Sequence, residues 1–289
     1  MDELEFDVFC AHNSHDKTQV EVIAGKLKRR NIKSWIDKDQ ILGGQSFQTK
    51  IQEVIPKVKS ATIFFGESGL GNWQKDEIEI LLDECKQSDK PLIPVLLPGI
   101  TEIPQELRFI RQRNWVSFNE GNHQALDKLE ASIKRKKIEP FFDVLLCYKQ
   151  EDLFEIREIG QQLKMADIAL WKAGLNSSNF PGISSSNLQG SVLRELEQHL
   201  DRTRIWSMAV FVGSSGGPWE KEVIEDIILD FRDAHLKVIP VILSSVAQAG
   251  DLKLPVYLRR LGAVDFRQND PDPMQRLLLG ITQEEKYSI

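Results

Sequence analysis

Two residues in the stretch "GNWQKDEIEILLDE", Trp73 and Glu77, have a spacing that could build a reactive site. They are four residues apart, so on a helix they lie on the same face, one turn from each other. A carboxylate beside a bound substrate can stabilise a developing positive charge or hold hydroxyl groups. The same carboxylate on a helix crowded with acids can equally be an ordinary solvated side chain. The stretch alone leaves both alternatives open.

The stretch "HNSHDK" offers a second set of reactive side chains. His12 and His15 stand three residues apart beside Asp16, and imidazole and carboxylate groups are common metal ligands. No third or fourth cluster of ligand residues accompanies them in the sequence. We therefore predict no metal site.

Motifs typical of other reactive sites are missing from the sequence. The loop "GESGLG" has the order GxxGxG instead of the dinucleotide-binding GxGxxG, and the GK[ST] ending of a P-loop is absent. No GxSxG motif and no cysteine–histidine pairing indicates nucleophilic catalysis. We interpret these glycines as a turn.

The 289-residue chain repeats itself at nearly constant offsets. The matching pairs are Asp7–Asp143 and Trp35–Trp171 at an offset of 136, Trp73–Trp219 and Ile93–Ile239 at 146, and Phe118–Phe266 at 148. An insertion of ten residues is predicted between Trp171 and Trp219, in the loop-like "GLNSSNFPGISSSNLQGS". A repeat of this length is a whole domain, so we predict domains at 1–137 and 138–289.

Each repeat alternates short apolar segments with stretches of helical periodicity. This alternation predicts an α/β fold of the flavodoxin-like kind, with a parallel five-stranded sheet covered by helices on both faces. In such sheets ligands bind beyond the carboxyl ends of the strands. The candidate site is therefore formed by the loops after Cys10, Trp35 and Phe65.

The overall composition excludes several function classes. A net charge of −6 and a pI near 5.5 argue against a nucleic-acid surface built on bulk charge. The three cysteines form no CxxC pair, which is typical of free thiols in a reducing compartment. The start "MDELEFDVF" is no signal sequence, and no apolar run reaches the roughly 18 residues of a membrane span. We expect a cytoplasmic protein without a membrane or nucleic-acid partner.

Both repeats resemble TIR (Toll/interleukin-1 receptor-like) domains. The segment "FDVFCAHNSHDK" resembles the first box of the family, and "SWIDKDQILGGQSF" resembles the second box with its BB loop. The segment "NWQKDEI" is similar to the Trp-x-x-x-Glu helix of bacterial and plant members. The last-strand region of the family is resembled by "LRFIRQRNWVSF" and by "LRRLGAVDF".

TIR domains are either NAD-cleaving enzymes or non-catalytic adaptors that assemble with other TIR domains. The resemblance implies that Glu77 is the catalytic carboxylate of an NAD+ glycohydrolase, with NAD+ as its substrate and no cofactor. The products would be nicotinamide and linear or cyclic ADP-ribose, in immune or cell-death signalling and, in bacteria, anti-phage defence. One carboxylate suffices because nicotinamide in NAD+ is already cationic and leaves without a general acid.

The resemblance also suggests which residues bind the substrate and which surfaces assemble. Self-assembly with other TIR domains is expected through BB-loop surfaces. The substrate-binding residues implied are His12, Asn13, Ser14, Trp35, Asp37, Gly44, Ser46, Phe47 and Trp73.

The second repeat departs from the first where the family has its active site. With Ile78 aligned to Ile224, Glu77 falls opposite Val223, and Glu222 lies one residue earlier. One residue turns a helix by about 100°, so the Glu222 carboxylate should point elsewhere. The second repeat also has "YKQED" in its first loop and lacks "GGQSF". We predict that it is catalytically degenerate and serves structure or assembly.

Two alternatives to the enzyme remain to be weighed. In one, the chain is a non-enzymatic interaction module whose two TIR domains bind other TIR proteins. In the other, it is a flavodoxin-like receiver, which needs a phosphoacceptor aspartate after the third strand. Gly66 and Glu67 follow that strand, so we set the receiver aside.

Overall fold

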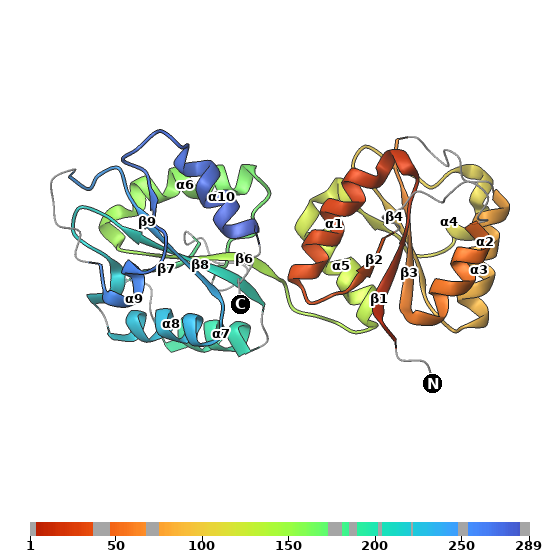
Figure 1. Ribbon diagram of the computed structural model, residues 1–289, viewed down its shortest axis with the longest axis horizontal. Coiled ribbons are helices and arrows are strands. Elements are labelled where there is room, and N and C mark those ends of the chain that lie inside the picture. Colours follow the sequence, from red (N-terminus) through yellow and green to blue (C-terminus); the bar gives the residue numbers. More distant parts are fainter. Residues whose placement is uncertain are drawn as a thin grey trace. The chain divides into compact units, whose positions relative to one another are not determined.

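A computed structural model describes residues 4–36, 47–67, 75–172, 181–184, 190–201, 204–220, 222–247 and 254–283. The chain divides into two compact units, the first unit at Met1–Pro140 and the second unit at Phe141–Ile289 (Figure 1). Each unit has its own sheet and its own apolar core.

The first unit is a parallel five-stranded sheet in the order β2-β1-β3-β4-β5. Its strands are β1 (Phe6–Ala11), β2 (Ser34–Trp35), β3 (Val58–Phe65), β4 (Leu92–Leu96) and β5 (Val116–Ser117). Its helices are α1 (Lys17–Arg29), α2 (Phe47–Val54), α3 (Lys75–Gln87), α4 (Arg108–Arg111) and α5 (Asn122–Lys134).

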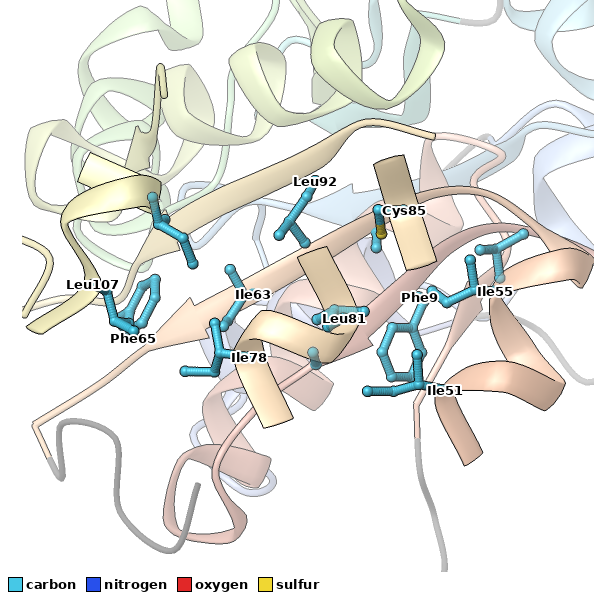
Figure 2. Close-up of a cluster of buried hydrophobic side chains, with 14 of the residues drawn as sticks. Phe9, Ile51, Ile55, Ile63, Phe65, Ile78, Leu81, Cys85, Leu92 and Leu107 are labelled. Atoms are coloured by element: carbon cyan, nitrogen blue, oxygen red, sulfur yellow. The ribbon is translucent and has the colours of Figure 1, made fainter. Parts of the chain in front are cut away.

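Both faces of this sheet are buried because successive strand side chains point to opposite faces. On β3, Ile63 and Phe65 pack against α3 and its neighbours α2 and α4, whereas Phe64 packs against α1 and α5. Figure 2 shows the first of these clusters, in which Ile78 and Leu81 of α3 lie over the strand side chains. The helices therefore lie on opposite faces of the sheet, as the uninterrupted apolar strands predict.

The second unit has the same topology, with a parallel sheet in the order β7-β6-β8-β9-β10. Its strands are β6 (Phe142–Tyr148), β7 (Ile183–Ser184), β8 (Ile205–Val212), β9 (Lys237–Ile242) and β10 (Val264–Asp265). Its helices are α6 (Leu153–Met165), α7 (Gly190–Asp201), α8 (Glu222–Asp233), α9 (Val256–Arg259) and α10 (Pro273–Thr282). The predicted fold class, two flavodoxin-like α/β domains with five-stranded parallel sheets, is confirmed.

The same hydrogen bonds tie the first strand of each unit to its neighbours. In the first unit the carboxylate of Asp7 accepts from the Lys33 N–H at 2.8 Å, and the Ser60 hydroxyl donates to the Asp7 carbonyl at 2.9 Å. In the second unit the Asp143 carboxylate accepts from the Ala169 N–H at 2.9 Å, and the Ser207 hydroxyl donates to the Asp143 carbonyl at 2.7 Å.

The edge strand of the second unit lies later in the chain than its counterpart in the first. Leu170 still makes a single parallel bridge to Val144, as Ser34 does to Val8. The strand β7, however, follows the insertion and pairs with Cys147 and Tyr148 at the end of β6. The central strands β3 and β8 start at Val58 and Ile205, an offset of 147. The offset before them is 136, so eleven residues are inserted before β8. The offset at Trp73 and Trp219 is 146, so one residue is lost after β8.

A buried ion pair joins α1 to α5 in the first unit. The Arg30 Nη1 atom lies 2.5 Å from Asp127 Oδ1 and 3.1 Å from Glu130 Oε2. Glu130 also accepts from Lys134 at 2.9 Å and is completely buried. The same repeat offsets place Ala166 and Leu278 at the positions of Arg30 and Glu130 in the second unit, where Leu278 packs against the apolar core.

Candidate functional site

Three predicted site residues lie together in the loop at the carboxyl end of β1. The Asn13 Oδ1 atom accepts from the His15 N–H at 3.2 Å and from the Ser14 hydroxyl at 3.3 Å, which orders the short turn before α1. His12 Nδ1 lies 2.8 Å from the Cys10 carbonyl oxygen. Asn13 is buried, His12 is half-buried and Ser14 is exposed, so the loop offers both ordered and accessible polar groups.

Glu77 lies in the first turn of α3, the helix that follows the central strand β3. It is half-buried beside the fully buried Ile78. Because β3 pairs in parallel with β1, the segment that leads to Glu77 starts at the same edge of the sheet as the loop after β1. A helix N-terminus also favours a negative charge.

The remaining predicted site residues are only partly described. Trp35 ends β2, is half-buried and packs against Phe9 with ring centroids 5.1 Å apart, so its ring covers one side of the core. Phe47 is the first residue of α2. The predicted site residues Asp37, Gly44, Ser46 and Trp73 lie outside the described residues.

The buried face of α3 and that of α8 share one register. The pairs Ile78–Ile224, Leu81–Ile227 and Cys85–Phe231 are buried in their respective units. In that register the position of Glu77 is occupied by Val223, which is 44% exposed, and Glu222 is exposed on the preceding residue. The packing of α8 thus puts no carboxylate at the place of Glu77.

The second unit covers the carboxyl edge of β6 with its own chain. Tyr148, at the position of His12, is only 2% exposed because β7 pairs alongside it. The Ser184 hydroxyl donates to Gln150 Oε1 at 3.3 Å, which links β7 to the loop after β6. Gly182 is needed there because a Cβ atom would lie 2.3 Å from the Leu146 carbonyl oxygen. The residue at this position is therefore a buried tyrosine in the second unit and a half-buried histidine in the first.

One buried carboxyl links the two loops of the first unit. Asp16 is 5% exposed, and its carboxylate packs against Gly66, directly after β3. Burial raises the pKa of Asp16; His12, the Gly66 N–H and His15 oppose the rise, and Glu67 adds to it. The sequence interpretation treated Asp16 only as a metal candidate. The sequence does carry one indication of a structural role: the aspartate recurs as Asp152 at the repeat offset of 136, although the neighbouring histidines do not recur.

The pKa of Asp152, the counterpart of Asp16 in the second unit, is raised to about 6 from an ordinary value near 3.8. Burial is the main cause, Glu151 and Glu155 add to it, and Lys149 opposes it. The folded chain thus holds this proton more tightly than the unfolded chain, so the cost of burying the carboxylate grows as pH rises from about 4 and is fully present above about pH 6.

Asp152→Asn should therefore stabilise the protein by roughly 2 kcal/mol at pH 7, with the gain fading to nothing near pH 4. Urea denaturation of the full chain at both pH values measures the effect. Asp233→Asn, which removes an exposed acid on α8, should give no pH-dependent gain. Equal midpoints for wild type and Asp152→Asn at pH 7 would contradict the prediction.

Other site chemistries find little support among the described residues. They hold no group of three or more His, Cys, Asp or Glu side chains placed to bind a metal. Burial raises the pKa of the Cys10 and Cys85 thiols to about 12, which makes them poor nucleophiles. No helix in the described parts of the chain is long and apolar enough to cross a membrane.

A surface pocket of about 200 Å³ is lined by side chains of α1 and by Pro98, Phe118 and Asn122, which follow β4 and β5. Its walls are mainly apolar. None of the predicted site residues lines it.

The fold and this site define a flavodoxin-like α/β domain with a carboxylate at the start of the helix after its central strand. Residues 8–131 match the family model described as "TIR domain", so the first unit is a TIR domain. None of the curated proteins compared with this sequence matches it.

Three solved structures illustrate the likeness. The TIR domain of the Toll-related receptor TRR-2 from Hydra magnipapillata is 17% identical, covers 45% of this chain and 98% of its own, and gives a TM-score of 0.36. A TIR-STING receptor from C. gigas in complex with 2',3'-cGAMP is 18% identical, with a match that covers 48% of this chain and 41% of the receptor chain at a TM-score of 0.37. The TIR domains of the activated Roq1 resistosome are 17% identical, with a match that covers 68% of this chain and 98% of theirs at a TM-score of 0.29. At such identities and TM-scores, these structures carry nothing about the substrate of this chain.

Proposed function

We propose that the protein is an NAD+ glycohydrolase of the TIR family, with one active site in the first unit. The observation that carries the proposal is the place of Glu77, half-buried in the first turn of α3, where the otherwise matching α8 has an exposed valine. NAD+ is the substrate, and the chemistry requires no cofactor.

In this reaction the bond between the nicotinamide nitrogen and the ribose carbon breaks, and its electron pair goes to nicotinamide. Positive charge then builds up on the ribose, and the Glu77 carboxylate stabilises it. A water oxygen forms the new bond and loses a proton, giving ADP-ribose; an attack by the adenine ring gives a cyclic product instead. Asn13 and Ser14 in the loop after β1 supply amide and hydroxyl groups for the nucleotide.

We place this activity in immune or cell-death signalling inside the cell, with self-association through TIR surfaces and anti-phage defence as its role in a bacterium. The three cysteines are free and buried, which fits a reducing compartment. The second unit serves structure or assembly in this proposal, because its edge at Tyr148 is covered by β7.

The second candidate is a non-enzymatic module that binds other TIR domains. The covered edge of the second unit favours it, since that unit keeps its core while its loop positions differ from those of the first. The two candidates differ in whether NAD+ is consumed.

The test is incubation of the purified full chain with NAD+ over a range of protein concentrations, with nicotinamide and ADP-ribose measured by chromatography. The enzyme should release both, at a rate per molecule that rises with protein concentration as copies associate. A chain that self-associates but releases no nicotinamide at any concentration would favour the adaptor and overturn the enzyme.

A further inference from the structure

Both units contain the same close contact between an aspartate and a glycine. Asp16 and Asp152 are the residues just before α1 and α6, and Gly66 and Gly213 directly follow the central strands β3 and β8. A Cβ atom on Gly66 would lie 2.0 Å from Asp16 Oδ1, and one on Gly213 would lie 1.9 Å from Asp152 Oδ1. A Cβ atom at either glycine would therefore displace the carboxylate from this position.

Neither carboxylate does what an aspartate before a helix usually does. Such a residue typically caps the helix by accepting from one of its first free N–H groups. Asp16 and Asp152 occupy the N-cap positions of α1 and α6, yet neither side chain makes a capping hydrogen bond. Each carboxylate instead contacts the glycine that follows the central strand, so it joins two loops and does not cap its own helix.

The two contacts differ in their charged neighbours. Burial raises the pKa of both carboxyls. His12 and His15 oppose this rise at Asp16 and Glu67 adds to it, whereas Glu151 and Glu155 add to it at Asp152 and Lys149 opposes it. The packing of the Asp16 carboxylate against Gly66 is the tie of the first unit, and its neighbours include two imidazoles that the second unit lacks.

The tie in the first unit joins the two halves of the candidate site. Asp16 closes the loop that begins with His12 and Asn13, and Gly66 opens the segment that leads to Glu77. Asn13 Nδ2 and Asp16 Oδ2 are both buried and have no hydrogen-bond partner among the described residues. The contact of Asp16 with Gly66 therefore lies beside two buried polar atoms, Asn13 Nδ2 and Asp16 Oδ2, that can still form a hydrogen bond.

We propose that Asp16 is a positioning residue, which holds the loop after β1 against Gly66 and so fixes the place of Glu77 relative to that loop. The proposal rests on the NAD+ glycohydrolase function above. Asp16 itself does not touch the reacting atoms. Its effect is on where the Glu77 carboxylate lies when charge develops on the ribose.

The test compares matched variants of the full chain in nicotinamide release. Asp16→Ala and Gly66→Ala should each lower kcat at least ten-fold with a smaller change in KM, because transition-state geometry is lost more than ground-state binding. Asp16→Asn should keep most of the activity, since asparagine has the same shape and can still pack against Gly66. Asp152→Ala and Gly213→Ala make the same changes in the second unit and should leave kcat unchanged.

Hydrogen–deuterium exchange on the same variants reports the tie without any activity. Asp16→Ala should speed exchange at the amides of Gly66 and Glu67, and Asp152→Ala should not. A kcat that falls only with the folded fraction, without rescue by Asp16→Asn, would show a merely structural role and overturn the proposal. If wild type releases no nicotinamide, the proposed function fails, and the exchange measurement then decides. Unchanged exchange at the amides of Gly66 and Glu67 in Asp16→Ala would overturn the positioning role.

Discussion

Replacing Glu77 with glutamine is expected to lower nicotinamide release by at least about a hundred-fold, the usual cost of removing one group that stabilises transition-state charge. Glutamine has nearly the same shape as glutamate but no negative charge to stabilise the cationic ribose. Because Glu77 is half-buried at the start of α3, the substitution should leave the unfolding midpoint nearly unchanged. Initial rates at saturating NAD+ measure the effect on kcat.

Glu222→Gln is the matched control, since Glu222 starts α8 as an exposed acid in the second unit. It should leave the rate within about two-fold, as surface substitutions away from a site do. Loss of turnover in Glu222→Gln with full turnover in Glu77→Gln would place the active site in the second unit. That result would contradict the register in which Val223 matches Glu77.

Most of the fold is predictable from the sequence because its strands and helices are long and strongly patterned. Ile78 and Leu81 were aligned to Ile224 and Ile227 from their apolar spacing, and both pairs are buried. Parallel strands joined by helices have few allowed arrangements, so the alternation of elements nearly dictates the sheet and its two covered faces.

The edge of the second sheet was harder to predict because two segments compete for it. Leu170 and Trp171 have the apolar pattern of the matching strand in the first unit, yet they give only one bridge, and β7 pairs farther along β6. Two-residue strands carry little periodicity, so pairing at an edge depends on the neighbouring chain rather than on the local pattern.

The contact of Asp16 with Gly66 was missed for a similar reason. The two residues are far apart in the sequence, and each is unremarkable locally, an aspartate before a helix and a glycine after a strand. Only the comparison of both units shows that the pair recurs as Asp152 and Gly213. The placement of the loop after β1 beside the segment after β3, by contrast, was predictable because strand ends in a parallel sheet gather at one edge.

Replacing Arg30 with alanine is expected to destabilise the protein by about 3 kcal/mol, because it leaves the buried Glu130 charge without one of its two cationic partners. The Arg30 side chain is 2% exposed and contacts Glu130, which is fully buried, and Asp127. Lys134 still pairs with Glu130 at 2.9 Å, which keeps the loss at the lower end of the usual range. Urea denaturation of the full chain, followed by circular dichroism, measures the shift of the midpoint.

The second unit supplies the control for this prediction, since it has Ala166 and Leu278 at the positions of Arg30 and Glu130. The double variant Arg30→Ala with Glu130→Leu removes both charges and should recover most of the lost stability, because apolar replacements of buried ion pairs are often neutral. Lys59→Ala breaks the exposed pair with Asp7 and should cost at most about 1 kcal/mol. A double variant as unstable as Arg30→Ala would contradict the prediction: the loss would then come from packing of the arginine stem and not from the stranded Glu130 charge.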